Sequence, residues 1–134
     1  MTEIAKNKHK VRLYWDSCGD EDFESMIWQL IHDLHYDNDG NELPLPIGVY
    51  GIPRGGCVMA AVISNRLNIP MLAAPCKGCI VVDDIADSGI TLKHYKDCGY
   101  PIYTWGYKTK SIVKPDWYYE IFKEDDWIIF PWEG

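Results

Sequence analysis

The residues best suited to chemistry follow a buried apolar strand. Residues 79–82 form a continuous apolar run, and Asp83 and Asp84 come directly after it. Two adjacent carboxylates repel a phosphate, because all three groups carry negative charge. They can instead accept hydrogen bonds from a sugar diol, or hold the waters of a Mg²⁺ ion that a substrate brings. We therefore expect Asp83 and Asp84 to bind a sugar and a hydrated metal ion.

The residues that follow have the composition of a phosphate-binding loop. Gly89 lets backbone N–H groups approach a ligand closely, and Ser88 and Thr91 add hydroxyl donors. A helix is expected to begin near Thr91, and its N-terminus directs free N–H groups into the same space. No Gly-Lys-Ser/Thr sequence follows, which excludes a P-loop of the nucleotide hydrolases. The predicted monophosphate pocket consists of Asp87, Ser88, Gly89, Ile90 and Thr91.

A second loop could bind another anion. Residues 53–56, Pro-Arg-Gly-Gly, follow the apolar run 47–51. Arg54 can donate two parallel hydrogen bonds to diphosphate oxygens. Gly55 and Gly56 allow backbone N–H groups to turn toward the same anion. We therefore expect a diphosphate site at Arg54, Gly55 and Gly56.

Alternating strands and helices must position these loops. Short apolar runs alternate with segments in which apolar residues recur every three or four positions. The expected order is strand 11–15, helix 23–34, strand 47–51, helix 58–67, strand 79–82, a helix from 91 and strand 102–105. This order is typical of an α/β fold, a parallel twisted sheet flanked by helices. Ligands of such sheets bind at the carboxyl ends of the strands, where loops 53–57 and 84–91 should meet.

Segment 81–92, VVDDIADSGITL, closely resembles the phosphoribosyl-diphosphate signature of type I phosphoribosyltransferases. Residues 53–56 resemble the pyrophosphate loop of that family, which often carries a non-proline cis peptide; here it would follow Arg54. The resemblance implies the type I phosphoribosyltransferase fold in a single domain, 1–134. It also implies a Mg²⁺-dependent transfer of ribose 5-phosphate from phosphoribosyl diphosphate. In this reaction Asp87 would be the general base, and Arg54 would stabilise the leaving diphosphate.

The C-terminal part suggests the acceptor. Lys108 and Trp127, nineteen residues apart, resemble a pair in bacterial xanthine–guanine phosphoribosyltransferases. The resemblance implies that Lys108 meets O6 of a 6-oxopurine, that Trp127 stacks on the base and that the Ile128 carbonyl recognises the 2-substituent. It implies guanine or xanthine as the base, then hypoxanthine, and a role in purine salvage. The alternative to base recognition is that Lys108 is exposed to solvent and that Trp127 only packs in the core.

One departure from the family concerns a flexible hood that closes over the site. Family members usually insert it before the strand with the two acids, whereas here only residues 73–79 separate Leu72 from Ile80. Without the hood, exclusion of water from the site is in doubt. Two alternatives therefore stay open: a phosphoribosyltransferase with another acceptor, and a module that senses phosphoribosyl diphosphate without turnover.

Composition excludes some other function classes. The chain has 134 residues and a net charge of −7, which argues against general nucleic-acid binding through a basic surface. The short basic group at residues 6–10 is expected to be a solvated tail. No apolar run reaches the ~20 residues that cross a bilayer, and the N-terminus lacks the apolar region of a signal peptide. We expect a cytoplasmic homo-oligomer, a dimer or tetramer, as in the family.

The five cysteines show no spaced disulfide framework, which fits a reducing compartment. Residues 76–79, Cys-Lys-Gly-Cys, have CxxC spacing, but neither a second pair nor a suitable histidine is near to complete a zinc site. A redox motif would place a helix after the first cysteine, and a strand is expected here instead. The sequence thus predicts no thiol chemistry.

Overall fold

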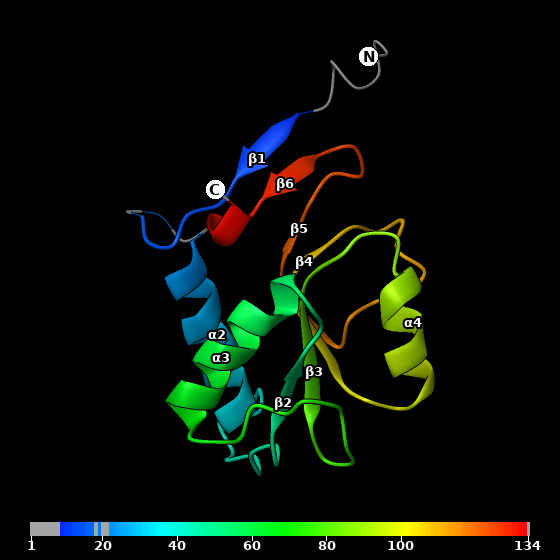
Figure 1. The fold of residues 1–134 in the computed structure, drawn as a ribbon. Coiled ribbons are helices and arrows are strands. Elements are labelled where there is room, and N and C mark those ends of the chain that lie inside the picture. Colours follow the sequence, from blue (N-terminus) through cyan, green and yellow to red (C-terminus); the bar gives the residue numbers. More distant parts are fainter. Residues whose placement is uncertain (1–8, 18, 20–21, 134) are drawn as a thin grey trace.

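A four-stranded parallel sheet is the centre of the molecule. The computed structural model describes residues 9–17, 19 and 22–133. The sheet has the strand order β2-β3-β4-β5, and β1 and β6 form a separate, small parallel sheet (Figure 1). The elements are β1 (Lys10–Arg12), α2 (Phe23–His35), β2 (Val49–Gly51), α3 (Gly55–Leu67), β3 (Ile80–Ala86), α4 (Ile90–Asp97), β4 (Ile102–Tyr107), β5 (Trp117–Ile121), β6 (Trp127–Ile129) and the 3₁₀ helix η1 (Pro131–Glu133). This architecture confirms the predicted α/β class.

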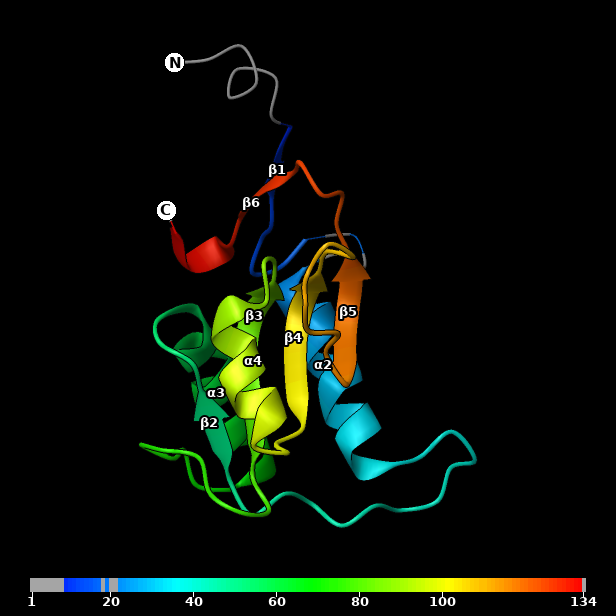
Figure 2. The ribbon, with the colours of Figure 1, turned by 90° about the vertical axis from the view of Figure 1, so that its right-hand side faces the viewer.

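Helices cover both faces of the main sheet. The helices α2 and α3 pack on one face and α4 on the other (Figure 2). Successive side chains of β3 alternate between these layers: Ile80 and Val82 face α2 and α3, whereas Val81 faces α4. Because both faces are covered, the central strands have continuous apolar sequences rather than alternating ones.

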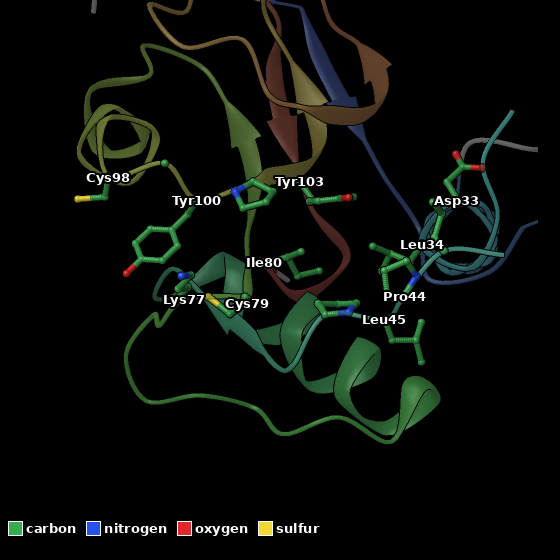
Figure 3. A pocket seen from close by; sticks show the side chains of 15 residues that line it. Asp33, Leu34, Pro44, Leu45, Lys77, Cys79, Ile80, Cys98, Tyr100 and Tyr103 are labelled. Atoms are coloured by element: carbon green, nitrogen blue, oxygen red, sulfur yellow. The ribbon is translucent and has the colours of Figure 1, made fainter. Parts of the chain in front are cut away.

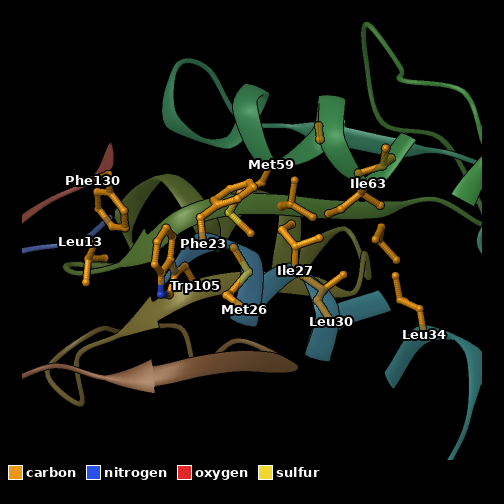
Figure 4. Close-up of a cluster of buried hydrophobic side chains, with 14 of the residues drawn as sticks. Leu13, Phe23, Met26, Ile27, Leu30, Leu34, Met59, Ile63, Trp105 and Phe130 are labelled. Atoms are coloured by element: carbon orange, nitrogen blue, oxygen red, sulfur yellow. The ribbon is translucent and has the colours of Figure 1, made fainter. Parts of the chain in front are cut away.

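Helix α2 begins where its sequence predicts, because Asp22 caps it. The Asp22 carboxylate accepts a hydrogen bond from the Ser25 N–H at 2.8 Å, which satisfies a backbone donor of the first turn. The buried face of α2 consists of Phe23, Met26, Ile27, Leu30 and Leu34 (Figure 4). Their spacing of three and four residues forms one apolar stripe against the sheet.

An aromatic cluster around Trp105 joins the small sheet to the main core. Trp105 of β4 is fully buried, and its ring centre lies 5.8 Å from that of Phe23 and 5.6 Å from that of Phe130 (Figure 4). Leu13, just after β1, belongs to the same core. This shared core places the small sheet beyond the carboxyl ends of the main strands (Figure 2).

The structure corrects several expected boundaries. Strand β3 continues to Ala86, so Asp83 and Asp84 lie inside the strand rather than after it. Pairing with β4 extends as far as Ala86 and Tyr107, and this tertiary pairing outweighs the low strand propensity of aspartate. The first strand covers residues 10–12 instead of 11–15, α3 begins at Gly55 instead of residue 58, and β5 and β6 were not predicted. Both missed strands are short, and β5 is only half-buried at the sheet edge.

The connection before β3 contains no inserted hood. Residues 72–79 have turns and bends but no helix or strand, and Met71 makes a single parallel bridge with Val49. Nothing in this connection can fold over the carboxyl ends of the strands, which lie at the opposite edge. Among the described residues, no helix is long and apolar enough to cross a membrane.

Replacing Trp105 should destabilise the fold far more than replacing Trp28. Trp105→Ala removes the ring between the two sheets, and we expect a loss of about 3–5 kcal/mol in the free energy of unfolding. Trp28 is 64% exposed, so Trp28→Ala should cost less than about 1 kcal/mol. Urea denaturation followed by circular dichroism measures both variants. Equal losses would contradict the role assigned to Trp105.

Candidate active site

Two adjoining cavities open at the carboxyl edge of the main sheet. The smaller, of about 170 Å³, lies at the N-terminus of α4. The larger, of about 630 Å³, lies between the sheet and residues 124–133. Ile85 and Asp87 line both cavities, so the two spaces meet at the end of β3.

The smaller cavity contains most of the predicted phosphate loop. Its polar lining consists of Asp83, Asp87, Ser88, Gly89 and Thr91. Gly89 is the N-cap of α4 with a φ of 82°, and a Cβ atom there would overlap the hydroxyl oxygen of Ser111. Conformation and space therefore both require glycine. The first amide groups of α4 have no partner within the helix, which favours an anion here. Ile90, in contrast, is 72% exposed and lines neither cavity.

The larger cavity brings together the residues predicted for the base. Its lining includes Asp84, Asp87, Lys108, Trp127 and Ile128. Trp127 is 56% exposed, which excludes the alternative of a core residue. The Lys10 ammonium of β1 lies over the Trp127 ring, 5.7 Å from its centre. The next residue, Ile128, has a buried side chain. The wall thus offers an aromatic face to a ligand.

Lys108 is a buried cation rather than a surface residue. Its side chain is 5% exposed, and its ammonium donates to the Asp126 carbonyl oxygen at 2.6 Å and lies 3.4 Å from Asp87 Oδ2. The Lys110 ammonium lies 3.1 Å from Asp87 Oδ1. Two cations therefore hold the Asp87 carboxylate at the junction of the cavities and partly neutralise its charge.

The two acids of β3 line different cavities. Asp83 lines the smaller one and Asp84 the larger, as expected for neighbouring residues of a strand. Burial raises the pKa of Asp83 to about 8, and the charge of Asp84 contributes. Burial also raises the pKa of Asp84, with a contribution from the charge of Glu133. Both carboxylates would therefore ionise more readily beside a cation or a hydroxyl donor.

This acid pair fits a hydrated Mg²⁺ ion. Mg²⁺ keeps several waters and binds proteins through one or two carboxylates together with substrate phosphates. Within the described part of the chain, no group of three or more histidine, cysteine or acidic side chains could hold a metal ion alone. The raised pKa values of Asp83 and Asp84 indicate two carboxylates that a cation would stabilise. The donor set suits a metal that arrives with a substrate.

The Arg54 loop packs against the acid pair. A Cβ atom on Gly55 would overlap the Asp84 carboxylate, and one on Gly56 would overlap the Val82 carbonyl oxygen. Only glycine lets the start of α3 come this close to β3. The Arg54 side chain is exposed, and neither Arg54 nor the two glycines line the two cavities.

The cis peptide bond lies one position before the expected one. It joins Pro53 and Arg54, not Arg54 and Gly55. The reason is that α3 begins at Gly55, and its N-cap Arg54 already has a right-handed helical conformation. The bond between Arg54 and Gly55 thus belongs to the first helical turn, in which peptide bonds are trans.

Three polar groups of the larger cavity were not foreseen. Lys110 pairs with Asp87, the Asp126 carbonyl accepts from Lys108, and Glu133 lies near Asp84. The position of Lys110 had no strand-like signal, because it lies in a turn in which the Ser111 N–H donates to the Lys108 carbonyl oxygen at 2.9 Å. Asp126 and Glu133 had none, because their positions depend on how the chain returns over the sheet.

The basic N-terminal segment is more than a solvated tail. His9 Nδ1 lies 3.4 Å from Asp126 Oδ1, and Lys10 contacts Trp127. Parallel pairing of β1 with β6 produces both contacts. The other two basic residues of the segment, Lys6 and Lys8, lie outside the described residues.

The raised pKa of Asp83 should make stability depend on pH. Between about pH 4 and pH 8 the folded protein keeps a proton that the unfolded chain releases, so the free energy of unfolding falls as the pH rises. Asp83→Asn preserves the side-chain shape and removes this titration. We expect the variant to gain on the order of 2 kcal/mol over the wild type at pH 8 and little at pH 4.

Urea denaturation at both pH values, without divalent cations, measures this difference. Asp39→Asn is the control, because Asp39 is an exposed acid in a turn. Parallel pH profiles for the wild type and Asp83→Asn would contradict the assignment.

Comparisons with known proteins agree with the fold. No protein-family model matches the chain. The chain is 26% identical to the xanthine–guanine phosphoribosyltransferase of Cereibacter sphaeroides, over 99% of this chain and 92% of that protein. The structure of a purine phosphoribosyltransferase from Pyrococcus horikoshii superposes with a TM-score of 0.71 at 27% identity, covering 93% of this chain and 94% of that one.

The xanthine–guanine–hypoxanthine phosphoribosyltransferase of Helicobacter pylori has the same fold. It superposes with a TM-score of 0.70 at 20% identity, over 93% of this chain and 94% of that one. The chain therefore has the type I phosphoribosyltransferase fold, and its sequence resembles the xanthine–guanine phosphoribosyltransferases along almost its whole length.

Proposed function

We propose that this protein transfers ribose 5-phosphate from phosphoribosyl diphosphate to N9 of a 6-oxopurine and releases diphosphate. The observation that carries the proposal is the meeting of two cavities at Asp87. One lies at a helix N-terminus and has room for a phosphate, and the other has room for a base beside the exposed Trp127. The similarity to xanthine–guanine phosphoribosyltransferases supports the same reaction.

The donor binds across the acid pair. Its 5-phosphate occupies the smaller cavity, where the Ser88 and Thr91 hydroxyls and the first amides of α4 donate hydrogen bonds. Asp83 and Asp84 accept hydrogen bonds from the ribose hydroxyls. Asp83 and Asp84 would also hold the waters of a substrate-bound Mg²⁺ ion, which would neutralise charge on the diphosphate. Because the donor is anchored at its 5-phosphate and at its diphosphate, its reacting ribose carbon is held between the two cavities.

The base binds in the larger cavity. Trp127 provides a flat face for the purine, while Lys10 lies over the same ring. Lys108 donates to the purine O6 in addition to the Asp126 carbonyl. The backbone carbonyl of Ile128 accepts a hydrogen bond from the 2-amino group of guanine. Guanine and xanthine are the preferred acceptors, followed by hypoxanthine.

The chain's own groups stabilise charge and move a proton. The ribose–diphosphate bond breaks as N9 approaches, and negative charge grows on the leaving diphosphate. Arg54 and the amides of Gly55 and Gly56 stabilise that charge. The Arg54 side chain is exposed and thus accessible to a diphosphate that binds beside the acid pair. Asp87, at the junction of the cavities, accepts the purine proton or a hydrogen bond at N7.

The short connection 72–79 favours a second function. It supplies no segment that could close over the site and exclude water, and exclusion of water protects a reactive sugar cation from hydrolysis. A protein that binds phosphoribosyl diphosphate without turnover needs no such closure. A phosphoribosyltransferase with another acceptor would keep residues 83–91 and differ only in the larger cavity.

A nucleotide-forming assay separates these functions. The protein is incubated with Mg²⁺, phosphoribosyl diphosphate and one base at a time, and products are resolved by chromatography. We expect nucleotide with guanine and xanthine. Product from another base alone would refute the acceptor assignment. Calorimetric binding of phosphoribosyl diphosphate without release of diphosphate would favour the sensor.

Replacing Lys108 should impair use of the base but not binding of phosphoribosyl diphosphate. Lys108→Met keeps much of the side-chain length and removes the charge, and we expect kcat/KM for guanine to fall about 10- to 100-fold. Affinity for phosphoribosyl diphosphate, measured by calorimetry, should stay within about threefold. Lys114→Met at an exposed position is the matched control. An equal loss of affinity for both substrates would contradict a role in base recognition.

A further inference from the structure

The CxxC motif forms a closed turn directly before β3. The Cys79 N–H donates to the Cys76 carbonyl oxygen at 3.1 Å, and Gly78 between them has a φ of 90°. Glycine adopts this conformation without a steric penalty. A turn closed in this way brings its first and fourth Cα atoms within about 7 Å. Disulfides join Cα atoms separated by about 4.4–6.8 Å, so the backbone is arranged for a bond between Cys76 and Cys79.

The two thiols differ in exposure. Cys79 is 1% exposed, and its sulfur accepts a hydrogen bond from the Cys76 N–H at 3.4 Å. Cys76 is exposed, and both thiols are reduced in the structure. Burial raises the pKa of Cys79, and the neighbouring Cys76 thiol contributes. Solvent thus reaches Cys76, whereas Cys79 is buried with its sulfur against the Cys76 backbone. Redox-sensing cysteines often have such a neighbouring resolving thiol.

We propose that Cys76 and Cys79 are a dithiol redox pair, which a low-molecular-weight disulfide converts to an intramolecular disulfide. The Cys76 thiolate attacks one sulfur of the small disulfide, whose S–S bond breaks and releases one thiol. The Cys79 sulfur then attacks the Cys76 sulfur of the mixed disulfide, the Cys79 proton passes to the leaving sulfur, and a second thiol departs. Two protein thiols are oxidised, and the small disulfide is reduced to two thiols.

The pair is separate from the candidate active site. Cys79 immediately precedes β3, whereas Asp83 lies at the centre of this strand and Asp84 one residue further along it. Cys79 and Lys77 line a cavity of about 830 Å³ at the opposite edge of the sheet (Figure 3). The proposal therefore does not depend on the transferase activity.

No helix follows Cys76, and the turn of residues 76–79 holds the two cysteines together instead. In helical CxxC motifs the helix holds the two cysteines close together, and here the hydrogen bond between Cys79 and Cys76 does so. Two cysteines alone do not complete a zinc site, and no third metal-ligating side chain joins them among the residues that the structure describes. Cys98 lines the same cavity from the end of α4, which makes it an internal control.

The test uses the full chain and oxidised glutathione. After incubation, free thiols are alkylated and the protein is digested and mapped by mass spectrometry. We expect a crosslink between Cys76 and Cys79, with loss of both from the alkylated pool, and reversal by dithiothreitol. Cys98→Ser should form the same crosslink. Cys79→Ser should stop at a glutathione adduct on Cys76, and Cys76→Ser should form no crosslink.

Two outcomes would overturn the proposal. One is a stable glutathione adduct on Cys76 in the wild type, which would show that Cys79 does not resolve it. The other is a crosslink between Cys76 and Cys98. Both are read in the wild-type protein, with its fold checked by circular dichroism, so the result does not depend on whether Cys79→Ser folds.

Discussion

Parallel pairing of β3 with β4 is the interaction on which the site depends. This pairing runs from Val81 opposite Ile102 to Ala86 opposite Tyr107, and the Lys108 N–H extends it to the Ala86 carbonyl at 2.9 Å. β2 ends at Gly51, opposite Val82, so the last part of β3 has one free side. The start of α3 packs there. The same backbone ladder thus sets the positions of the acid pair, Lys108 and the two glycines of the Arg54 loop.

A second constraint comes from the small sheet formed by β1 and β6. Its strands come from opposite ends of the described chain, and neither could form a stable sheet alone. The ring of Trp105 supplies the contact that fixes this sheet over the main strands, through Phe130 and Phe23. A buried aromatic cluster therefore determines where the exposed Trp127 stands. Trp105 thus shapes the larger cavity without lining it.

The electrostatics of the site explain how an acidic chain can bind an anion. The net charge is −7, and the two acids of β3 are costly to ionise because they are partly buried near each other. The groups that we propose for phosphate binding are mostly neutral: hydroxyls, and the amides of a helix N-terminus that carry a partial positive charge. The cations Lys108 and Lys110 are held against Asp87. Charge is thus concentrated at the junction of the two cavities, while the phosphate end is built from dipoles.

The sequence alone determined the α/β class and the edge of the sheet that carries the loops, because apolar runs and helical periodicity are local patterns. It also predicted Asp83, Asp84 and residues 87–91 as site residues, and of these all but Ile90 line at least one of the two cavities. It could not show that Asp83 and Asp84 lie inside β3, because pairing with β4 overrides local propensity. Nor could it place Glu133, Asp126 and Lys10 beside the site. The tertiary structure decided these positions, since they depend on contacts between segments that are far apart in the chain.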